Sequence, residues 1–489
     1  MGEHVEGLSR DQTALFPQTL DEYVEKDNPV RFIDAFVDTL NLEKLGFRHA
    51  LSSEVGRPSY DPKDLLKLYL YGYLNQVRSS RRLERECHRN VEVMWLMKKL
   101  APDFKTIADF RKDNIECVKG VFKEFVKLCI SLDLCGASCI AVDGTKFKAV
   151  NSLDKNFNRS KLSYRIDLID RRVSDYLAQL EEQDRQEAQA DSKHVEVLQE
   201  KVHKLMERKE EYAELLSKLK ESKQTEVSLV DPDCRLMKSR GKVEPCYNAT
   251  VAVDDKNHLI VDYNVTNSPN DLGQLSSIAI GAKKMLGAER LDALADKGFF
   301  SFVQIKDCVD NGIIPYVSEQ NRYGVGFVKR KGIPTREFHS DRFVYDLEKD
   351  MFVCPAGQAL RFRYVDHAHQ KNIRVYSSEA CLSCKFFMTK CTTNKRGRTL
   401  WRWEQAQLID EMRERLRLEP KKLILRKSLV EHPFGTIKRA FNQGYLLLRG
   451  LRKVCGEVGF SMLAYNMRRI LSLLGPRVFA CLSNLQAKA

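Results

Sequence analysis

Two short apolar runs, at 139–142 and 291–295, each lead into an aspartate that a glycine follows at once or one residue later. These aspartates are Asp143 and Asp296. Short apolar runs that end in a turn signal are typical of buried strands. Acids at the ends of neighbouring strands can converge at one edge of a sheet and bind Mg²⁺, although an aspartate before glycine is more often a turn residue.

The elements between and after these two runs predict an α/β fold. Alternating apolar residues predict a β-hairpin over 247–265 with its turn at 254–257. A helix capped by Asn270 and Asp271 follows, and then the second run, a further helix and an apolar strand at 313–317. This element order is that of a ribonuclease-H-like fold.

Helical patterns indicate further domains, as expected for 489 residues, which are too many for one core. Residues 30–135 are predicted to form an all-α N-terminal domain. From Val195 to Leu219, apolar residues recur at alternating steps of three and four, broken once by Lys209, which is a heptad seam. An earlier apolar helix at 168–180 is separated from it by a polar stretch. We expect an inserted antiparallel helical hairpin, with an intermolecular coiled coil as the alternative.

An excess of positive charge favours a polyanionic partner. Lys and Arg total 81 against 67 Asp and Glu, a net charge of +14. The window 421–470 holds eleven basic and two acidic residues, and the window 385–403 mixes six basic residues with aromatics. Such mixtures suit a nucleic-acid groove, with a solvated surface as the alternative. No apolar run reaches the ~18 residues of a membrane span, and no signal peptide is recognisable, so we expect no membrane association and a cytoplasmic protein.

A third acid, Glu431, lies on a predicted helix with Lys438 seven residues further along. Seven residues make two turns, which would put both side chains on one face, although a helix start near Pro433 is equally compatible. Two Mg²⁺ ions about 3.5 to 4 Å apart need several carboxylates. Glu431 and the two aspartates therefore form a candidate metal site. Glu404 and Glu411 are alternative third ligands.

Short motifs follow one another in a specific order along nearly the whole chain. They are Tyr60-Asp61-Pro62, Arg78-Ser79-Ser80-Arg81, Pro102-Asp103-Phe104-Lys105-Thr106-Ile107, Phe110-Arg111, Val142-Asp143-Gly144-Thr145-Lys146, Asp231-Pro232-Asp233, Ala295-Asp296-Lys297-Gly298 and Glu431-His432-Pro433-Phe434-Gly435-Thr436-Ile437-Lys438. In this order they resemble the DDE transposases of bacterial insertion sequences, in the branch with an N-terminal helical domain and a Cys-rich insertion before the catalytic glutamate.

The resemblance implies a ribonuclease-H-like core with two Mg²⁺ (or Mn²⁺) ions on a catalytic triad of Asp143, Asp296 and Glu431. Lys438 would be the family's signature lysine. Related enzymes have a tyrosine and an arginine at fixed steps before the glutamate, where this chain has Ile424 and Lys427. Arg426, one place away, and Lys427 therefore share the expected contact with phosphate. The residues expected to bind DNA are Arg426, Lys427, Lys438, Arg439, Trp401 and Trp403.

Four cysteines in the basic insertion form a candidate zinc site. Cys381 and Cys384 make a C-x2-C pair, and Cys354 and Cys391 lie nearby in sequence. Four thiolates suit tetrahedral Zn²⁺, and a structural metal would compensate for a small core. Scattered reduced thiols are the alternative. In the same insertion Trp401 and Trp403 are spaced to share one strand face, and core packing is favoured over base stacking for them.

These features predict a DNA transposase that cleaves element ends and joins 3′-hydroxyls to target double-stranded DNA. We expect a homodimer on DNA, associated with the nucleoid in the bacterial cytoplasm. A nuclease without strand transfer, an inactive DNA-binding derivative and a helical scaffold are the alternatives. The expected boundaries are 1–135 (N-terminal helical, DNA-binding), 136–164 (core), 165–222 (helical hairpin), 223–320 (core), 321–404 (Cys-rich basic insertion), 405–475 (core, with Glu431) and 476–489 (tail).

Overall fold

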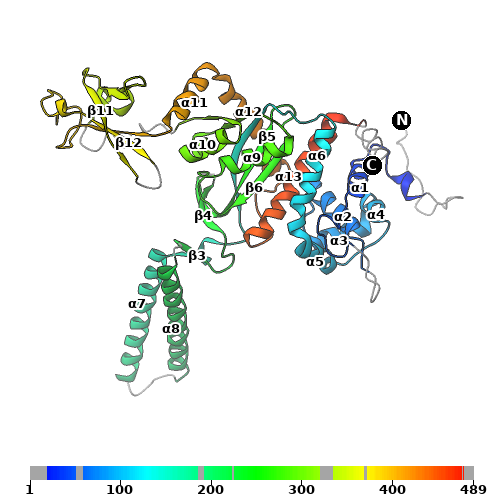
Figure 1. The fold of residues 1–489 in the computed structure, drawn as a ribbon. Helices are drawn as coiled ribbons and strands as arrows, with labels where there is room; N and C mark the ends of the chain where they lie inside the picture. The colour runs from blue at the N-terminus through cyan, green and yellow to red at the C-terminus, as the bar shows by residue number, and fades with distance from the viewer. Residues whose placement is uncertain are drawn as a thin grey trace, which may run out of the picture. The chain divides into compact units, whose positions relative to one another are not determined.

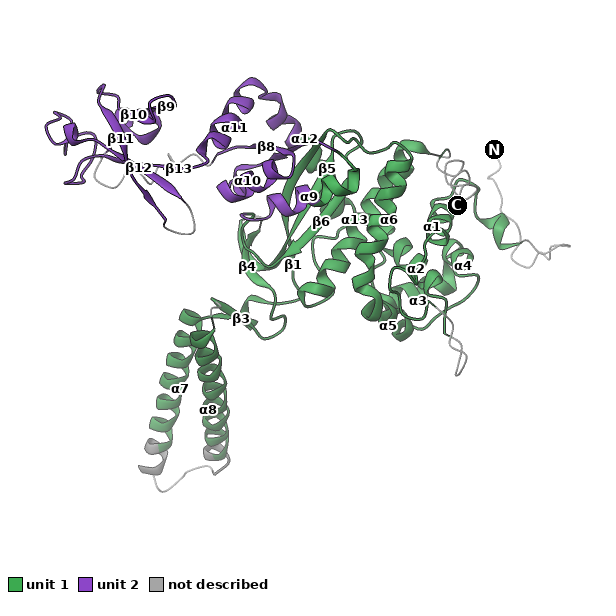
Figure 2. Cartoon of the chain, viewed as in Figure 1, with its two compact units in different colours: residues 1–271, 281–288, 428–489 green, residues 272–280, 289–427 purple. Residues whose placement is uncertain are grey.

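The computed structural model describes residues 19–50, 59–185, 192–222, 225–239, 241–319, 334–367, 372–475 and 477. The chain divides into two compact units (Figure 2). Unit 1 comprises residues 1–271, 281–288 and 428–489, and unit 2 comprises residues 272–280 and 289–427. Among the candidate catalytic residues, Asp143 and Glu431 therefore belong to unit 1 and Asp296 to unit 2.

The N-terminal part of unit 1 is helical, as predicted (Figure 1). Two of the sequence motifs begin helices here. Asp61 accepts a hydrogen bond from the Lys63 amide and precedes Pro62 at the first helical position, and Asp103 accepts one from the Thr106 amide. The helices are α1 (Pro29–Asp38), α2 (Pro62–Leu74), α3 (Ser80–Arg89), α4 (Val91–Leu96), α5 (Phe104–Asn114) and α6 (Val118–Ser131).

The sheet of unit 1 is antiparallel. Strand β5 (Lys242–Asp254) pairs with β1 (Cys139–Lys148), and also with β4 (Arg235–Ser239) and β6 (Ile260–Thr266). Helix α13 (Leu451–Leu474) is buried along much of its length and contacts α2, α6 and β6. Tyr73 and Tyr69 stack on Phe460 of α13, with ring centroids 4.9 and 5.6 Å away. The N-terminal helices and the sheet therefore share one core.

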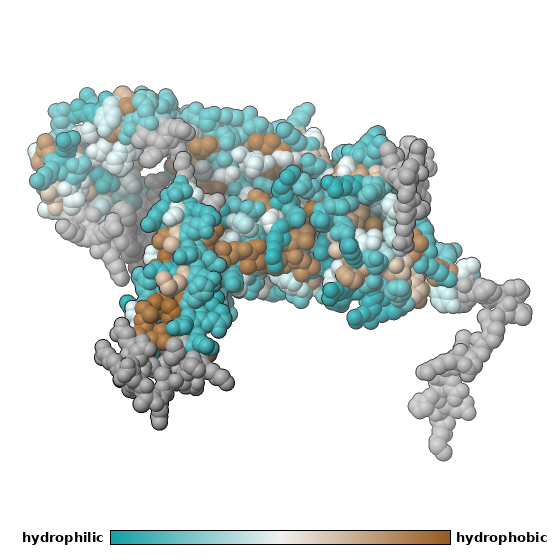
Figure 3. Space-filling view, turned by 90° about the horizontal axis from the view of Figure 1, so that it is seen from below, coloured by the Kyte–Doolittle hydropathy of each residue, from teal (hydrophilic) through white to brown (hydrophobic). Residues whose placement is uncertain are grey.

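The helical insertion is present and packs on itself. Helices α7 (Arg159–Arg185) and α8 (Ser192–Glu221) lie side by side and extend from the short strands β2 (Asn156–Asn158) and β3 (Glu226–Ser228). Phe157, Leu162 and Leu219 form a small core at their base. Apolar side chains also remain exposed on this hairpin, where Figure 3 shows a brown patch; they include Tyr164, Leu177, Val197 and Met206.

Unit 2 contains a parallel strand pair and a separate antiparallel sheet. The pair is β7 (Leu291–Ala295) and β8 (Ile313–Val317), linked through α10 (Phe302–Asp310). The sheet has the order β13-β12-β11-β10-β9. Its strands are β9 (Val344–Asp346), β10 (Met351–Val353), β11 (Ala359–Asp366), β12 (Ile373–Ser377) and β13 (Thr399–Trp403). Helix α11 (Ala406–Leu418) follows, and α9 (Leu275–Leu286) and α12 (Lys421–Gly435) each cross the division between the units.

None of the helices in the described ranges has the length and apolar character needed to cross a bilayer.

Candidate active site

Asp143 lies in the middle of β1, not at its end. The sequence predicts a strand that finishes at this acid, but β1 continues to Lys148. The reason is pairing: Gly144, Thr145 and Lys146 stay in register with Thr250, Ala249 and Asn248 of β5. The half-buried Asp143 carboxylate accepts a hydrogen bond of 2.8 Å from the Gly144 amide. Because side chains alternate along a strand, Asp143 shares its face of the sheet with Phe147.

Lys438 lies over that same face. It belongs to a π-helical turn at Thr436–Ala440, directly after α12. Its ammonium donates a hydrogen bond of 2.7 Å to the Lys146 carbonyl and lies 5.3 Å from the centroid of the Phe147 ring. The structure therefore brings the signature lysine to the strand that carries Asp143, across nearly 300 residues of sequence.

Glu431 is exposed on α12, five residues before the π-helical turn begins. The helix is continuous through Pro433, so the alternative that it begins near this proline is wrong. His432 fixes this part of α12 to α13, because its Nδ1 lies 2.8 Å from the Tyr465 hydroxyl. That hydroxyl donates its proton to the His258 carbonyl at 2.7 Å, so it accepts a proton from Nδ1 of His432.

Acidification is expected to destabilise this junction. Burial lowers the pKa of His432 and His258 below 6.5, and the Arg469 charge lowers both further. The unfolded chain therefore takes up protons first as pH falls, so stability is lost below about pH 6.5. The melting temperature should fall less between pH 7.5 and 5.5 in His432→Gln than in the unmodified protein. Equal losses would contradict the role assigned to His432.

Asp296 follows β7 directly, as the sequence predicts. It caps the short 3₁₀ helix Lys297–Phe299 and accepts a hydrogen bond of 2.8 Å from the Gly298 amide. The glycine that marked this motif in the sequence thus supplies the amide that orients the carboxylate.

A fourth carboxylate, Asp271, lies against the opposite face of β1. It accepts hydrogen bonds from Lys146 at 3.2 Å and Asn248 at 2.6 Å. A Cβ added to Gly144 would lie 2.5 Å from Asp271 Oδ1, so a larger residue here would displace the Asp271 carboxylate. The sequence predicted Asp271 as a helix cap, but α9 begins only at Leu275. Its pairing with β1 had no signal in the local sequence.

The Asp231-Pro232-Asp233 motif holds the start of α13. Asp231 is buried and accepts hydrogen bonds from the Tyr247 hydroxyl at 2.7 Å and the Gly450 amide at 3.1 Å. Asp233 accepts one from the Leu451 amide at 2.8 Å. Carboxylates are favourable at a helix N-terminus, so these acids have a structural role.

The donor chemistry fits a hard divalent cation, since Asp143, Asp296 and Glu431 offer oxygen ligands. As the side chains stand, however, no three His, Cys, Asp or Glu residues within the described ranges are grouped to hold a metal ion.

Comparison with known families decides the identity. A family described as "Transposase domain (DUF772)" matches residues 18–113, which are the N-terminal helices, and one described as "Transposase DDE domain" matches residues 353–471. Both matches support a DDE transposase of insertion-sequence type. The resemblance predicted from the motifs is thereby confirmed. The second match includes Glu431 and Lys438. No curated protein and no solved structure matches the chain.

The basic residues expected to contact DNA in this transposase are spread over both units. Arg426 and Lys427 lie on the part of α12 that belongs to unit 2, whereas Lys438 and Arg439 lie in the π-helical turn of unit 1. Their contact with DNA stays a prediction. The alternative ligands Glu404 and Glu411 accept hydrogen bonds from Asn372 at 2.8 Å and Gln407 at 3.1 Å.

Trp401 and Trp403 share one face of β13, since they pair with Val375 and Ile373 of β12. The expectation of core packing is wrong for Trp401, whose side chain is 68% exposed. It is correct in part for Trp403, which is half-buried with its ring 5.4 Å from the Phe302 ring. Leu400 and Arg402 point to the other face of β13, and Leu400 is the residue that enters the core of this sheet.

Proposed function

We propose that this transposase cleaves phosphodiester bonds at the ends of an insertion sequence and joins the freed 3′-hydroxyls to target DNA. One observation carries the proposal. Lys438, inside the segment that matches the transposase DDE domain, bonds to the strand that carries Asp143. This contact between the segment that follows Glu431 and the strand of Asp143 supports the proposal that both carboxylates serve one site.

The reaction needs two in-line displacements at phosphorus. Water attacks at the element end, the bond to the 3′ oxygen breaks, and a 3′-hydroxyl and a 5′-phosphate result. The 3′-hydroxyl then attacks a target phosphodiester, and one such bond forms for each that breaks. Asp143, Asp296 and Glu431 would hold two Mg²⁺ or Mn²⁺ ions, which would supply the positive charge that favours the attacking and the leaving oxygen.

The chain's own residues supply orientation and charge. The Gly144 and Gly298 amides hold the carboxylates of Asp143 and Asp296 at 2.8 Å each. Lys438 is fixed through the Lys146 carbonyl, so its charge stays beside β1, where it would neutralise phosphate. Arg426, Lys427 and Arg439 would bind the DNA backbone. Synapsis of two element ends would require a dimer on DNA, in the cytoplasm where the nucleoid is accessible.

A nuclease without strand transfer is the second candidate, because it would use the same carboxylates. Labelled DNA carrying the flanking terminal repeats tests both functions, with Mg²⁺ or EDTA and with Asp143→Asn as the matched variant. Metal-dependent nicks and joined products, both absent from the variant, are expected of the transposase. Nicks without joined products would favour the nuclease, and binding without cleavage would favour an inactive DNA-binding derivative.

A further inference from the structure

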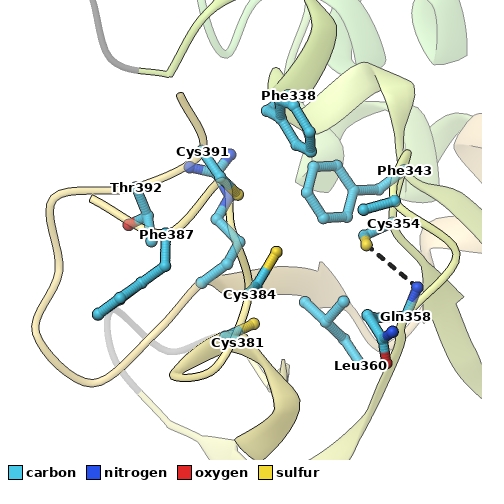
Figure 4. Close-up of a pocket in the computed structure, with 12 residues that line it drawn as sticks. Phe338, Phe343, Cys354, Gln358, Leu360, Cys381, Cys384, Phe387, Cys391 and Thr392 are labelled. Atoms are coloured by element: carbon cyan, nitrogen blue, oxygen red, sulfur yellow. Dashed lines mark hydrogen bonds between the residues drawn. The ribbon is translucent and has the colours of Figure 1, made fainter. Parts of the chain in front are cut away.

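The four cysteines of the insertion line one cavity in unit 2 (Figure 4). Cys354 follows strand β10, Cys381 and Cys384 lie in the turn after β12, and Cys391 lies in the loop before β13. The sequence separates these segments by up to 37 residues, yet their thiols point toward a common space in Figure 4. The fold has thus brought the thiols to one place.

Tight turns hold these thiols in position. The Cys354 amide donates to the Gln358 carbonyl at 2.9 Å, and the Gln358 amide donates back to the Cys354 sulfur at 3.2 Å. The Cys384 amide donates to the Cys381 carbonyl at 3.2 Å, which closes the C-x2-C turn. An amide directed at a sulfur stabilises a thiolate, because a hydrogen bond to the charged form favours that form.

Much of the cavity wall is apolar, including the side chains of Phe338, Phe343, Leu360 and Phe387. The cavity itself measures about 20 Å³, which is room for about one water-sized guest. An organic ligand would not fit, whereas a single atomic ion would.

A half-buried arginine completes the lining of the cavity. Arg398 lines it beside the thiols, with its guanidinium 5.5 Å from the centroid of the Phe343 ring. Its Nε is buried and has no hydrogen-bond partner among the described residues. Burial lowers the pKa of Arg398, and Cys391 and Cys381 act against this shift. A buried cation is costly without negative charge nearby, and thiolates would provide that charge.

Close packing around Gly397 fixes the loop that carries this arginine. Gly397 has a φ of +88°, and a Cβ there would lie 2.9 Å from the Cys381 Cβ. Only glycine suits this position, so the backbone beside Arg398 lies directly against the C-x2-C turn.

We propose that Cys354, Cys381, Cys384 and Cys391 bind one thiophilic divalent cation of the zinc class, with Arg398 offsetting the negative charge of the four thiolates. Four thiolates and one dication carry a net charge of −2, which the guanidinium reduces to −1. Tetrahedral sulfur coordination is the usual structural zinc site. As the side chains stand, the sulfurs are not yet grouped at coordinating distances within the described residues. The cation would draw the three loops together by small side-chain movements.

The small core around these loops explains why a metal is useful here. Among the described residues, Phe343, Leu360, Tyr376 and Leu400 form one small buried cluster in this sheet, with Cys354 and Cys391 packed against it. So small a core contributes little stability, and a structural metal commonly supplies the remainder. A disulfide is the chemical alternative, but the four thiols are free in the structure.

Metal content of the purified full-length protein tests the proposal, without need for DNA or activity. Plasma mass spectrometry should find one zinc per chain in the unmodified protein. Cys384→Ser should lose it, whereas Cys308→Ser should retain it, because Cys308 is a buried cysteine of the same unit in α10. Arg398→Met should keep the ion but release it to a chelator at about 10-fold lower chelator concentration.

Cobalt substitution covers the case in which Cys384→Ser does not fold. Co²⁺ in the unmodified protein should give the intense sulfur-to-cobalt charge-transfer band and the visible bands of a tetrahedral site. Three results would overturn the proposal: four alkylatable thiols without metal, a disulfide among the four, or zinc retained in soluble Cys384→Ser. None of these results depends on strand transfer, so the metal proposal and the proposed function are tested independently.

Discussion

Replacing Glu457 by glutamine is expected to lower the free energy of unfolding by about 3 to 5 kcal/mol, the usual cost of removing one partner of a buried ion pair. Glu457 lies on α13 with 1% exposure, and Arg78 faces it at 3.7 Å with 6% exposure. The Glu457 carboxylate also accepts hydrogen bonds from the backbone amides of Leu447 and Leu448, at 2.8 Å each. Glutamine would leave the Arg78 charge buried without a counterion.

The matched control is an exposed ion pair of the same type. Glu116 pairs with Arg452 at 2.9 Å, but the two side chains are 55% and 83% exposed. Glu116→Gln should change stability by less than about 1 kcal/mol. Urea unfolding followed by circular dichroism compares the two variants. Similar midpoints for both would show that the Arg78–Glu457 pair does not hold the N-terminal helices to α13.

Replacing Glu431 by glutamine is expected to lower the rate of metal-dependent DNA cleavage by more than about 1,000-fold, which corresponds to roughly 4 kcal/mol of transition-state stabilisation. The amide keeps the size of the side chain but removes the charge that would hold the second ion. Because Glu431 is exposed on α12, the melting temperature should hardly change.

Glu404→Gln and Glu411→Gln are the controls for Glu431. Both are exposed glutamates of unit 2 that accept hydrogen bonds from neighbouring amide side chains. Cleavage rates within a few-fold of the unmodified protein are expected. Loss of cleavage in Glu404→Gln with full activity in Glu431→Gln would show that Glu404, and not Glu431, is the third carboxylate.

Sequence patterns predicted the helices and strands that are determined by residues close together in the chain. The alternating residues of 247–265 form β5 and β6, as expected. The end of β1 was not predictable in this way. Whether residues after Asp143 continue the strand depends on β5, which lies about 100 residues further along.

Long-range contacts explain the remaining differences. Arg78 belongs to the motif Arg78-Ser79-Ser80-Arg81, but its partner Glu457 lies 379 residues away and makes it a core residue. Asp271 accepts a hydrogen bond from Lys146, which lies 125 residues earlier. No local sequence pattern predicts this contact. Trp401 has a large apolar side chain, which is typical of a core residue. Because Leu400 enters the core and side chains alternate along β13, Trp401 points to the exposed face of the strand. The sequence identified the four cysteines as candidate zinc ligands. Their shared cavity could not be predicted, because it forms only when three separate loops come together in the fold.

Strand transfer from pre-cleaved ends tests the central claim most directly. A labelled element end with a free 3′-hydroxyl is incubated with the full-length protein, Mg²⁺ and a supercoiled target plasmid. The transposase should covalently join the end to the plasmid, and joining should disappear with EDTA, with Asp143→Asn and with a 3′-deoxy end. Plasmid nicking without any joined product, at a protein concentration that saturates the labelled DNA end, would contradict the proposed transposase activity. The protein would then be a nuclease without strand transfer.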